Sequence, residues 1–406
     1  MEPVKRLSTM TDLQGELLKN KELGRNIFAN LMNDSGYIPI ELPVVENTEL
    51  FLRKSGGSLA PQMYSFRDPI GNQVSLRPEI TTQIVNYYLE NYDIGDSVKI
   101  QYDGPVFRYD HNLNKGMQFS QIGGEYIGVC DFVSDLEVIS LASKIPYSLG
   151  VSEYSLRIAD LGIVNSIVGN FDISSKNRNL IIENIHLLKE NDDVIKQFAQ
   201  RLASPNITGD GNRDAYLSDA IHDLNDTQAR QVISGFLGWV NSGHDNNSLG
   251  RRSNDDIIDR LFDKLKNNDS LEVIQQALSV VSKLIQIQGE FEDCLNRAKS
   301  IFESLEVELV AIHKFENLLK NLNEVMPADC KILVDFGLVR EFNYYTGIIF
   351  EIEELSEGAL LGGGGRYDGM GSSTVSGKTL DALGFAFDLD KMLFYGDASS
   401  MEKTCE

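Results

Sequence analysis

Hydrophobic positions near the N-terminus recur at helical spacing. Between Thr11 and Gly36 they are Leu13, Leu17, Leu23, Ile27, Phe28 and Leu31. This period predicts one amphipathic helix with Gly36 as its C-terminal stop. The run YIPIELPVV that follows is typical of a strand. Further along, QVSLR predicts another strand, and Pro78 opens a second helix through ITTQIVNYYLENY.

The middle of the first half predicts paired strands. Residues 104–128, GPVFRYDHNLNKGMQFSQIGGEYIG, indicate two strands joined by a polar loop. A short helix is expected near Asp131 to Lys144, followed by YSLRIADLGIV, a strand whose exit is marked by glycine. This part of the chain therefore has a mixed, largely antiparallel α+β pattern.

The pattern becomes helical from about Asn170 to Val325, in segments such as NRNLIIENIHLLKE, DDIIDRLFDKLK and LEVIQQALSVVSKLIQIQ. Strand patterns return in CKILVDFGLV, YYTGIIFEIEEL, LLGGGGRYDG and ALGFAFDLDKMLF. We therefore expect a split sheet domain, residues 1–170 and 325–406, interrupted by an all-helical insertion at 171–324.

Composition narrows the class of protein. The 406 residues, 42% of them hydrophobic, suffice for a folded chain of two or three domains. No signal peptide or membrane-spanning run is evident, so a soluble, cytoplasmic protein is expected. The formal charge of −23 argues against a large nucleic-acid surface, although a local basic patch stays possible.

Metal and cofactor signals are absent from the sequence. The four cysteines and five histidines form no ligand spacing, which predicts reduced thiols and no metal site. The segment 371–379, GSSTVSGKT, has five residues where a P-loop has four, and no apolar strand precedes it. No cofactor is predicted.

Polar residues on the predicted strands carry the candidate chemistry. They are Arg77, Glu79, Thr81, Arg108, Gln121, Glu125, Arg340, Tyr344, Tyr345, Arg366 and Tyr367. A solvated sheet face would explain any one of them. Together they supply carboxylates, an amide and phenols for an ammonium and an imidazole, and arginines for a carboxylate. Such a set suits a zwitterionic amino acid with a hydrogen-bonding side chain.

Several of these segments resemble the signature segments of the histidyl-tRNA synthetases, a class II synthetase family. They are LRPEITT, GPVFRYD with QFSQIGGE, LVREFNYYTGIIFE, GGGRYDGM and ALGFAFDLDKML, within about 1–170 and 325–395. The resemblance implies an antiparallel sheet flanked by helices. It also implies a homodimer formed through the N-terminal helix and the strand that contains Pro43.

The resemblance implies a histidine pocket. Glu79, Thr81 and Gln121 would hold the α-ammonium. Glu125 and Tyr345 would meet the two imidazole nitrogens. The remaining pocket residues would be Tyr344 and Tyr367, which line it, Arg108 at the substrate carboxylate or α-phosphate, and Arg340 as the family's second catalytic arginine.

The sequence also departs from the synthetase pattern. Where the family ends its last motif in glycine, an apolar residue, glutamate and an ATP-clamping arginine, this chain has Asp388, Leu389, Asp390 and Lys391. Lysine lacks the planar fork of arginine, and a carboxylate at residue 388 would repel phosphates. Met117 replaces an arginine, REFNYY replaces the family's Arg-Gly-Leu-Asp-Tyr-Tyr, and the C-terminal anticodon-binding domain is expected to be absent.

A retained histidine pocket beside a damaged ATP end resembles the regulatory subunits of ATP phosphoribosyltransferase, which opens histidine biosynthesis. That resemblance implies a non-catalytic subunit in a hetero-oligomer, commonly an octamer, with a short catalytic subunit. It implies feedback inhibition by histidine and no binding of tRNA. Two alternatives stay open: a histidine-activating enzyme of the synthetase class, and a scaffold whose pocket has drifted.

Overall fold

The computed structural model describes residues 10, 12–54, 59–110, 115–129, 131–203, 224, 228, 230–235, 269–340, 344–370, 380–397 and 400–401. The chain forms two compact units. Residues Met1–Val164 and Leu284–Glu406 make the first, and Asn165–Lys283 make the second. The first unit carries the sheets, and the described part of the second is helical.

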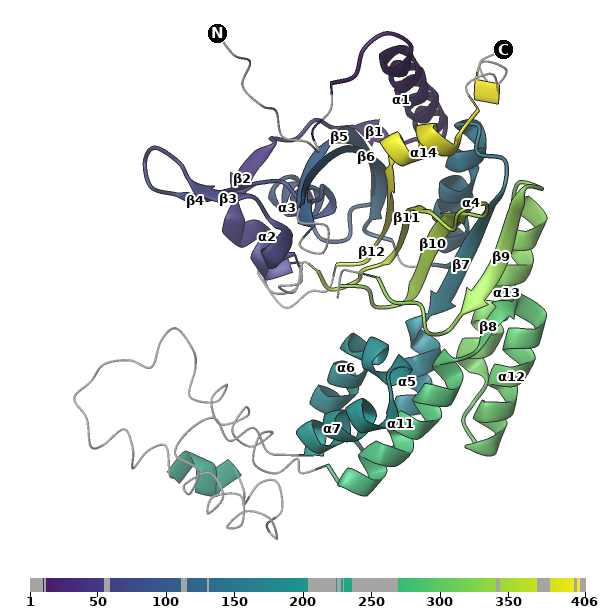
Figure 1. Cartoon of the computed structure of the whole chain (residues 1–406). Helices are drawn as coiled ribbons and strands as arrows, with labels where there is room; N and C mark the ends of the chain where they lie inside the picture. Colours follow the sequence, from purple (N-terminus) through teal and green to yellow (C-terminus); the bar gives the residue numbers. More distant parts are fainter. Residues whose placement is uncertain are drawn as a thin grey trace. The chain divides into compact units, whose positions relative to one another are not determined.

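The main sheet of the first unit has nine described strands in the order β1-β5-β6-β12-β11-β10-β7-β9-β8 (Figure 1). Their bounds are β1 Ile38–Pro39, β5 Val98–Asp110, β6 Lys115–Ile127, β7 Tyr154–Asp160, β8 Gln288–Glu290, β9 Cys330–Asp335, β10 Ile348–Glu354, β11 Leu360–Arg366 and β12 Ala382–Asp388. Neighbouring strands run antiparallel except in the parallel pairs β1–β5 and β7–β9. The predicted α+β class is thereby confirmed.

The long hairpin β5–β6 determines which residues share a face. Its register places Tyr102 opposite Gly123 and Ile100 opposite Glu125. Because side chains alternate along a strand, Tyr102 and Arg108 share one face with Gln121 and Glu125. Gln101 points to the other face, where its amide donates to Asn33 and to the Tyr37 carbonyl.

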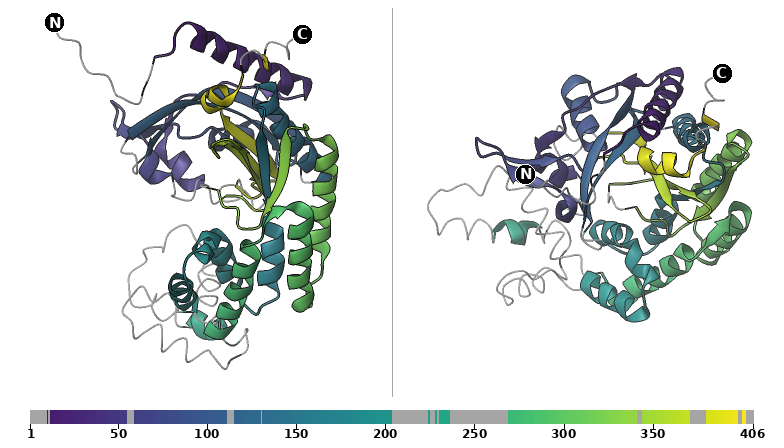
Figure 2. Two further views of the ribbon diagram at one scale, coloured as in Figure 1. Left: turned by 45° about the vertical axis from the view of Figure 1, so that its right-hand side comes forward. Right: turned by 45° about the horizontal axis from the view of Figure 1, so that its top comes forward.

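Helices of the first unit cover both faces of this sheet (Figure 2). Their bounds are α1 Glu16–Asp34, α2 Thr48–Lys54, α3 Thr81–Asn91, α4 Phe132–Ser148, α12 Phe291–Ser304, α13 Val310–Val325 and α14 Leu389–Tyr395, with a short 3-10 turn at Ala60–Gln62. Helix α4 contacts α1 and α13. A small antiparallel sheet, β2-β4-β3, is formed by β2 Val45–Asn47, β3 Ser65–Arg67 and β4 Gln73–Leu76.

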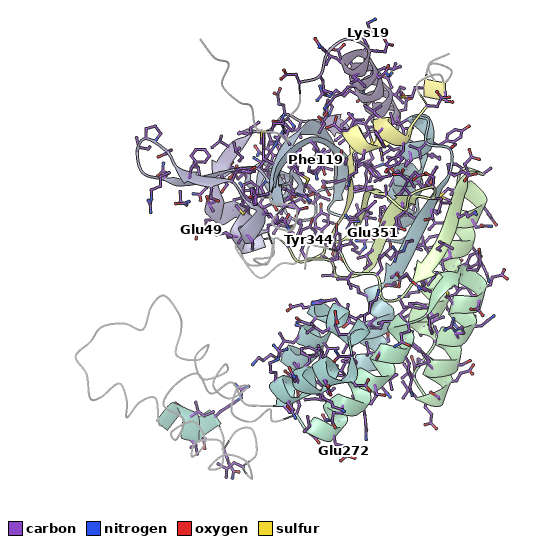
Figure 3. All side chains as sticks on the ribbon, in the orientation of Figure 1. Lys19, Glu49, Phe119, Glu272, Tyr344 and Glu351 are labelled. Atoms are coloured by element: carbon purple, nitrogen blue, oxygen red, sulfur yellow. The ribbon has the colours of Figure 1, made fainter. Side chains whose placement is uncertain are left out.

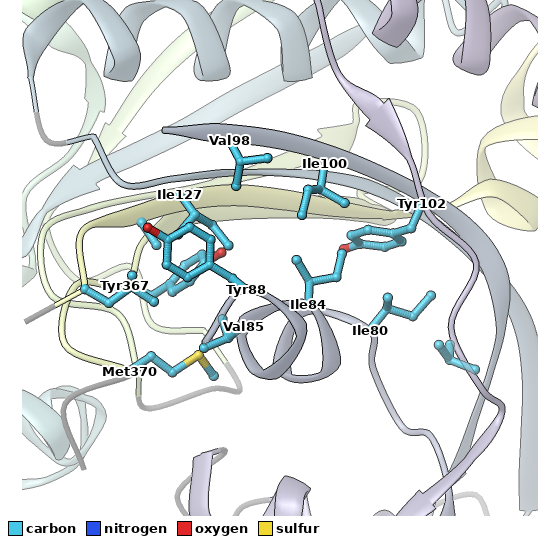
Figure 4. Packing of buried hydrophobic residues seen from close by; sticks show 13 residues of the cluster. Ile80, Ile84, Val85, Tyr88, Val98, Ile100, Tyr102, Ile127, Tyr367 and Met370 are labelled. Atoms are coloured by element: carbon cyan, nitrogen blue, oxygen red, sulfur yellow. The ribbon is translucent and has the colours of Figure 1, made fainter. Parts of the chain in front are cut away.

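Helix α3 packs on the opposite face of the sheet from α1. Figure 4 shows Ile80, Ile84 and Tyr88 of this segment against Val98 and Ile100 of β5. Tyr102 and Tyr367 belong to the same buried cluster. Burial of such aliphatic and aromatic side chains contributes roughly 1.5–3 kcal/mol each, so this cluster fixes α3 on the sheet.

The second unit is described through short helices, namely α6 Ser175–Glu183, α7 Asp192–Ala203 and a 3-10 helix at Ile185–Lys189. Helices α5 Leu161–Gly169 and α11 Leu271–Ile285 contain the points where the chain passes between units. Asp269 accepts hydrogen bonds from the Ser174 amide at 2.9 Å and from the Asn177 side chain at 2.7 Å. These bonds join the start of α6 to the segment that leads into α11.

Two sequence expectations differ from the structure. The insertion was expected to extend to residue 324, yet α12 and α13 belong to the first unit, and β8 between them and α11 pairs with β9. Helical periodicity predicts a helix but not the surface on which it packs. The strand expected over YIPIELPVV is limited to β1 and the start of β2, and Pro43 lies between them, where its carbonyl accepts from Gln83.

The N-terminal helix ends as predicted. Gly36 adopts a φ of +80°, a left-handed conformation that favours glycine, and its amide donates to the Asn33 carbonyl. Within the described ranges, no helix is both long enough and apolar enough to cross a membrane.

Arg77 provides a test of how the two sheets are joined. Its side chain is 4% exposed and donates to the carbonyls of Pro105 and Leu42, each at 2.8 Å. We expect Arg77→Lys to lower the free energy of unfolding by about 2 kcal/mol, because a lysine cannot reach both carbonyls in that geometry. Urea unfolding of the purified chain would measure the change.

The matched control is Arg67→Lys on β3, where the arginine is exposed and donates to the Gly71 carbonyl. This variant should change the unfolding free energy by less than about 0.5 kcal/mol. Equal effects of the two substitutions would show that Arg77 does not join the sheets.

Candidate functional site

A cavity of about 520 Å³ lies on the sheet face that carries Glu125. Phe119, Tyr344 and Glu351, labelled in Figure 3, are three of its lining residues. All nine predicted pocket residues line this one cavity: Glu79, Thr81, Arg108, Gln121, Glu125, Arg340, Tyr344, Tyr345 and Tyr367. Segments far apart in the chain are thus brought together by the sheet.

Glycines leave room for the charged groups of the cavity. A Cβ on Gly384 would lie 1.6 Å from Oε2 of Glu125, which the register places on the adjacent strand. A Cβ on Gly363 would lie 2.0 Å from Nη1 of Arg340. The glycine run 362–365 therefore brings backbone close to a side chain, as well as to neighbouring strands.

One end of the cavity is lined by polar groups at the start of α3. Glu79 is 1% exposed, and both of its carboxylate oxygens accept from the Thr82 amide, at 3.2 and 3.1 Å. The side-chain oxygen of Gln121 accepts a hydrogen bond from the Ile80 amide at 3.1 Å. The other polar group of this side chain, its NH₂, can act only as a donor. Burial raises the pKa of Glu79, while the positive charge of Arg108 lowers it.

Glu125 is the centre of a buried hydrogen-bond network. Thr81 Oγ1 donates to Oε1 at 2.7 Å, Tyr102 Oη donates to the same oxygen at 3.3 Å, and Tyr367 Oη donates to Oε2 at 2.6 Å. Burial raises the pKa of Glu125 to about 8, and these three hydrogen bonds oppose that rise. The carboxyl group is therefore mostly protonated at pH 7 and titrates near pH 8.

Two arginines and two tyrosines form another wall. Arg108 donates through Nε to the Pro78 carbonyl at 2.9 Å, and its guanidinium lies 5.5 Å from the ring centroid of Phe119. Arg340 donates to the Phe350 carbonyl at 3.0 Å and lies 3.6 Å from Glu351. The rings of Tyr344 and Tyr345 are 4.8 Å apart, so these aromatic side chains pack as one wall.

The remaining end of the cavity is acidic. Asp388 caps α14 by accepting from the Lys391 amide at 3.1 Å, and burial raises the pKa of this carboxyl group. Nζ of Lys391 donates to the Leu360 carbonyl at 3.3 Å. The N-terminus of α14, which would favour an anion, is therefore already capped by the carboxylate of Asp388.

Some of the polar residues singled out in the sequence lie elsewhere. Arg77 holds backbone carbonyls and does not line the cavity. Arg366 donates to Asp135 and to the Val129 carbonyl, and so it is also structural. Asp390 accepts from the Ser120 amide at 2.8 Å and pairs with Lys21 of α1. Residues 111, 222, 244 and 371–379 lie outside the described residues.

Sequence reasoning missed Tyr102, which contacts Glu125 from a fully buried position on β5. The alternation of β5 puts it on the same face as Arg108, which was the available signal. It also missed Glu351 and Phe119 as cavity residues. In the part of the chain that the structure describes, no group of three His, Cys, Asp or Glu side chains could hold a metal ion.

The family model described as "Histidyl-tRNA synthetase" matches residues 9–209 and 253–392, well over half of the chain. The chain belongs to the histidyl-tRNA synthetase family. A histidine–tRNA ligase from Sulfolobus acidocaldarius is 27% identical over 387 residues, which cover 94% of this chain and 72% of that protein. One from Saccharolobus solfataricus is 28% identical over 369 residues, covering 90% and 69%.

Solved structures of the histidyl-tRNA synthetase family share the fold. One from Bacillus halodurans C, described as an ATP phosphoribosyltransferase regulatory subunit/histidyl-tRNA synthetase, has a TM-score of 0.63 at 20% identity, covering 98% of this chain and 84% of that one. A histidine–tRNA ligase subunit from Alicyclobacillus acidocaldarius has a TM-score of 0.55 at 18% identity, covering 100% and 99%. The main sheet with its helices is therefore of the class II synthetase type.

The raised pKa of Glu125 predicts a pH-dependent stability. In the unfolded chain this carboxyl loses its proton near its ordinary value of 4.5, whereas in the folded chain it does so near 8. Unfolding then releases a proton between these values, so this group destabilises the fold progressively as pH rises from about 4.5 to 8. Glu125→Gln removes the titration, and its melting temperature relative to wild type should rise between pH 5.5 and 8.5.

Glu316→Gln is the matched control for this pH series. Lys299 and Lys320 lower the pKa of Glu316 to about 2, so its contribution is lost only in acid. Between pH 5.5 and 8.5 this variant should differ from wild type by a constant amount. A constant difference for Glu125→Gln as well would mean that Glu125 is ionised throughout this range.

Proposed function

We propose that the cavity binds free L-histidine. The observation that carries this proposal is the meeting, in one cavity, of acceptors for an ammonium, arginines for a carboxylate, and a buried carboxyl with a phenol for a ring. Such a division of polar groups matches an amino acid whose side chain offers two ring nitrogens. Membership of the histidyl-tRNA synthetase family supports the same ligand.

The ammonium of histidine would lie between Glu79 and Gln121. Both side chains are already fixed by backbone amides at the start of α3, so little conformational entropy is lost when they bind a ligand. The carboxylate of the amino acid would meet Arg108, whose side chain is held by the Pro78 carbonyl and packs against Phe119. These contacts would orient the ligand backbone independently of its side chain.

The imidazole ring would lie between Glu125 and Tyr345. Glu125 is buried and Tyr345 is partly buried, and a ring without nitrogen atoms would leave their cavity-facing hydrogen-bonding positions unfilled. A site built in this way rejects an isostere that lacks hydrogen-bonding groups more strongly than a hydrophobic pocket rejects an extra methylene. Selectivity for histidine over phenylalanine would follow from this arrangement.

We infer further that the chain binds histidine without activating it efficiently, and acts as the regulatory subunit of ATP phosphoribosyltransferase. Asp388 places a carboxylate at the end of the cavity where a phosphate donor would need positive charge, and Lys391 cannot form a bidentate fork there. In this role histidine would inhibit a hetero-oligomer with the short catalytic subunit. Feedback requires histidine to bind two states of that assembly with different affinities.

Histidine activation, the first step catalysed by a histidine–tRNA ligase, is the second candidate. It is favoured by the two arginines in the cavity, Arg108 and Arg340, and by the names of the relatives aligned with most of the chain. Under this reading Arg108 and Arg340 would contact the phosphates of ATP beside the bound histidine. Asp388 and Lys391 would then lower the rate without abolishing it.

Calorimetric titration of L-histidine into the purified chain, with ATP–pyrophosphate exchange on the same sample, separates these possibilities. Histidine binding without exchange supports the regulatory subunit. Exchange at an enzymatic rate supports the activating enzyme. Absence of histidine binding contradicts both candidate functions.

Glu125→Ala is the direct test of the ring contact. We expect it to weaken histidine binding by at least about 30-fold, because the hydrogen bond of the Glu125 carboxyl group to the ring is lost and the ring nitrogen is left unpaired in a buried site. Glu303→Ala, an exposed glutamate on α12, should leave the affinity unchanged. An unchanged affinity in Glu125→Ala would place histidine elsewhere or exclude it as the ligand.

The double variant Asp388→Gly with Lys391→Arg tests the acidic end. It should raise histidine-dependent exchange at least about tenfold over wild type, since it removes a repulsive charge and restores a bidentate donor. Replacing the capping aspartate with glycine costs only a few tenths of a kcal/mol at an N-cap, so the helix should persist. No gain in exchange would mean that these two positions do not limit activation.

A further inference from the structure

Three hydroxyl groups surround the carboxylate of Glu125. They come from Thr81 on α3, Tyr102 on β5 and Tyr367 after β11, and all three lie within 3.3 Å of a carboxylate oxygen. A carboxylate offers about four acceptor positions in total. Three donors therefore leave about one position free to accept a hydrogen from a ligand in the cavity.

Tyr102 differs from the other two donors because it does not line the cavity. It is 3% exposed, lies in the core cluster of Figure 4, and is absent from the lining of the cavity, whereas Thr81 and Tyr367 are part of that lining. A Cβ on Gly123, directly opposite on β6, would lie 2.4 Å from the Tyr102 hydroxyl oxygen. The sequence thus has glycine where any other residue would displace this hydroxyl from Glu125.

We propose that Tyr102 is a positioning residue that sets the side-chain specificity of the histidine site. Its hydroxyl, together with those of Thr81 and Tyr367, holds the Glu125 carboxylate as an acceptor for one ring N–H of the bound amino acid. This inference rests on the proposed binding of histidine. It adds a requirement that the ligand ring must donate, which shape alone would not impose.

The electrostatics of the network agree with this role. Each hydroxyl that donates to Glu125 stabilises the charged form and lowers its pKa, against the effect of burial. Loss of the Tyr102 donor would raise the pKa of Glu125 further. A protonated Glu125 can donate its own hydrogen, and would then accept a ring that carries only an acceptor nitrogen.

The test compares L-histidine with L-3-(thiazol-4-yl)alanine, a ring isostere with an acceptor nitrogen and no N–H, by calorimetric titration at pH 7 and pH 9. The two ligands share the amino-acid backbone, so the ratio of their affinities reports the ring contact. At pH 9 the wild-type ratio should favour histidine, and Tyr102→Phe should reduce this preference by about tenfold. At pH 7 the two proteins should differ less, since Glu125 is largely protonated in both.

Tyr154→Phe is the matched control, because Tyr154 is a fully buried tyrosine that donates to the Ser143 carbonyl away from the cavity. It should keep the wild-type affinity ratio at both pH values even if its melting temperature falls. A Tyr102→Phe ratio equal to that of wild type at both pH values would overturn the proposal.

A second pair of variants keeps the test decisive if Tyr102→Phe does not fold. Thr81→Ser retains a hydroxyl donor to Glu125, and the isosteric Thr81→Val removes it. Only Thr81→Val should reduce the preference for histidine at pH 9, and equal ratios would contradict the three-donor arrangement. If wild type binds no histidine, the proposed function fails. If wild type binds histidine and the ratios do not move, only the role of Tyr102 fails.

Discussion

Burial of two carboxyl groups on one face of the main sheet is the constraint around which the site is organised. Glu79 and Glu125 are each 1% exposed, and burial, with a further contribution from the charge of Glu79, raises the pKa of Glu125. An unpaired buried carboxylate would cost several kcal/mol, and both groups receive hydrogen bonds from the surrounding helix and strands. The backbone amide of Thr82 in α3 donates to Glu79, and hydroxyl groups from three parts of the chain donate to Glu125.

This constraint explains the composition of the neighbouring strands. Glycine at residue 384 leaves space for the Glu125 carboxylate, and glycine at residue 363 leaves space for Arg340. Strand glycines weaken a sheet because they bury no side chain, and that cost is offset here by the packing of α3 against β5. A rigid scaffold and an open cavity are thus obtained from the same strands. Hydrogen bonds within the chain hold Gln121, Arg108 and Arg340 in place on the walls of this cavity.

Much of this arrangement could be predicted from sequence because it depends on local pattern and residue type. The sequence put Arg108, Gln121 and Glu125 on one predicted pair of strands, and all three line the cavity. Residue type and predicted strands could not distinguish Arg77 from the arginines that line the cavity. Arg77 donates to backbone carbonyls, and the sequence alone does not show which of these two roles an arginine has. Nor could it find Tyr102, whose contact with Glu125 depends on the cross-strand register. The boundary at residue 324 failed for a related reason, because α12 and α13 pack by tertiary contacts that periodicity does not encode.

The acidic end of the cavity has structural roles that bear on its chemistry. Asp388 caps α14, and Asp390 links that helix to the Ser120 amide of β6 and to Lys21 of α1. Ser120 precedes Gln121 directly, so the bond from its amide helps to fix the strand that carries a pocket residue. A phosphate group at this position would have to displace a capping carboxylate or lie beside it, and either arrangement opposes binding. Under the proposed function, the carboxylate that caps α14 would therefore also disfavour a nucleotide, while the other end of the cavity would accept an amino acid.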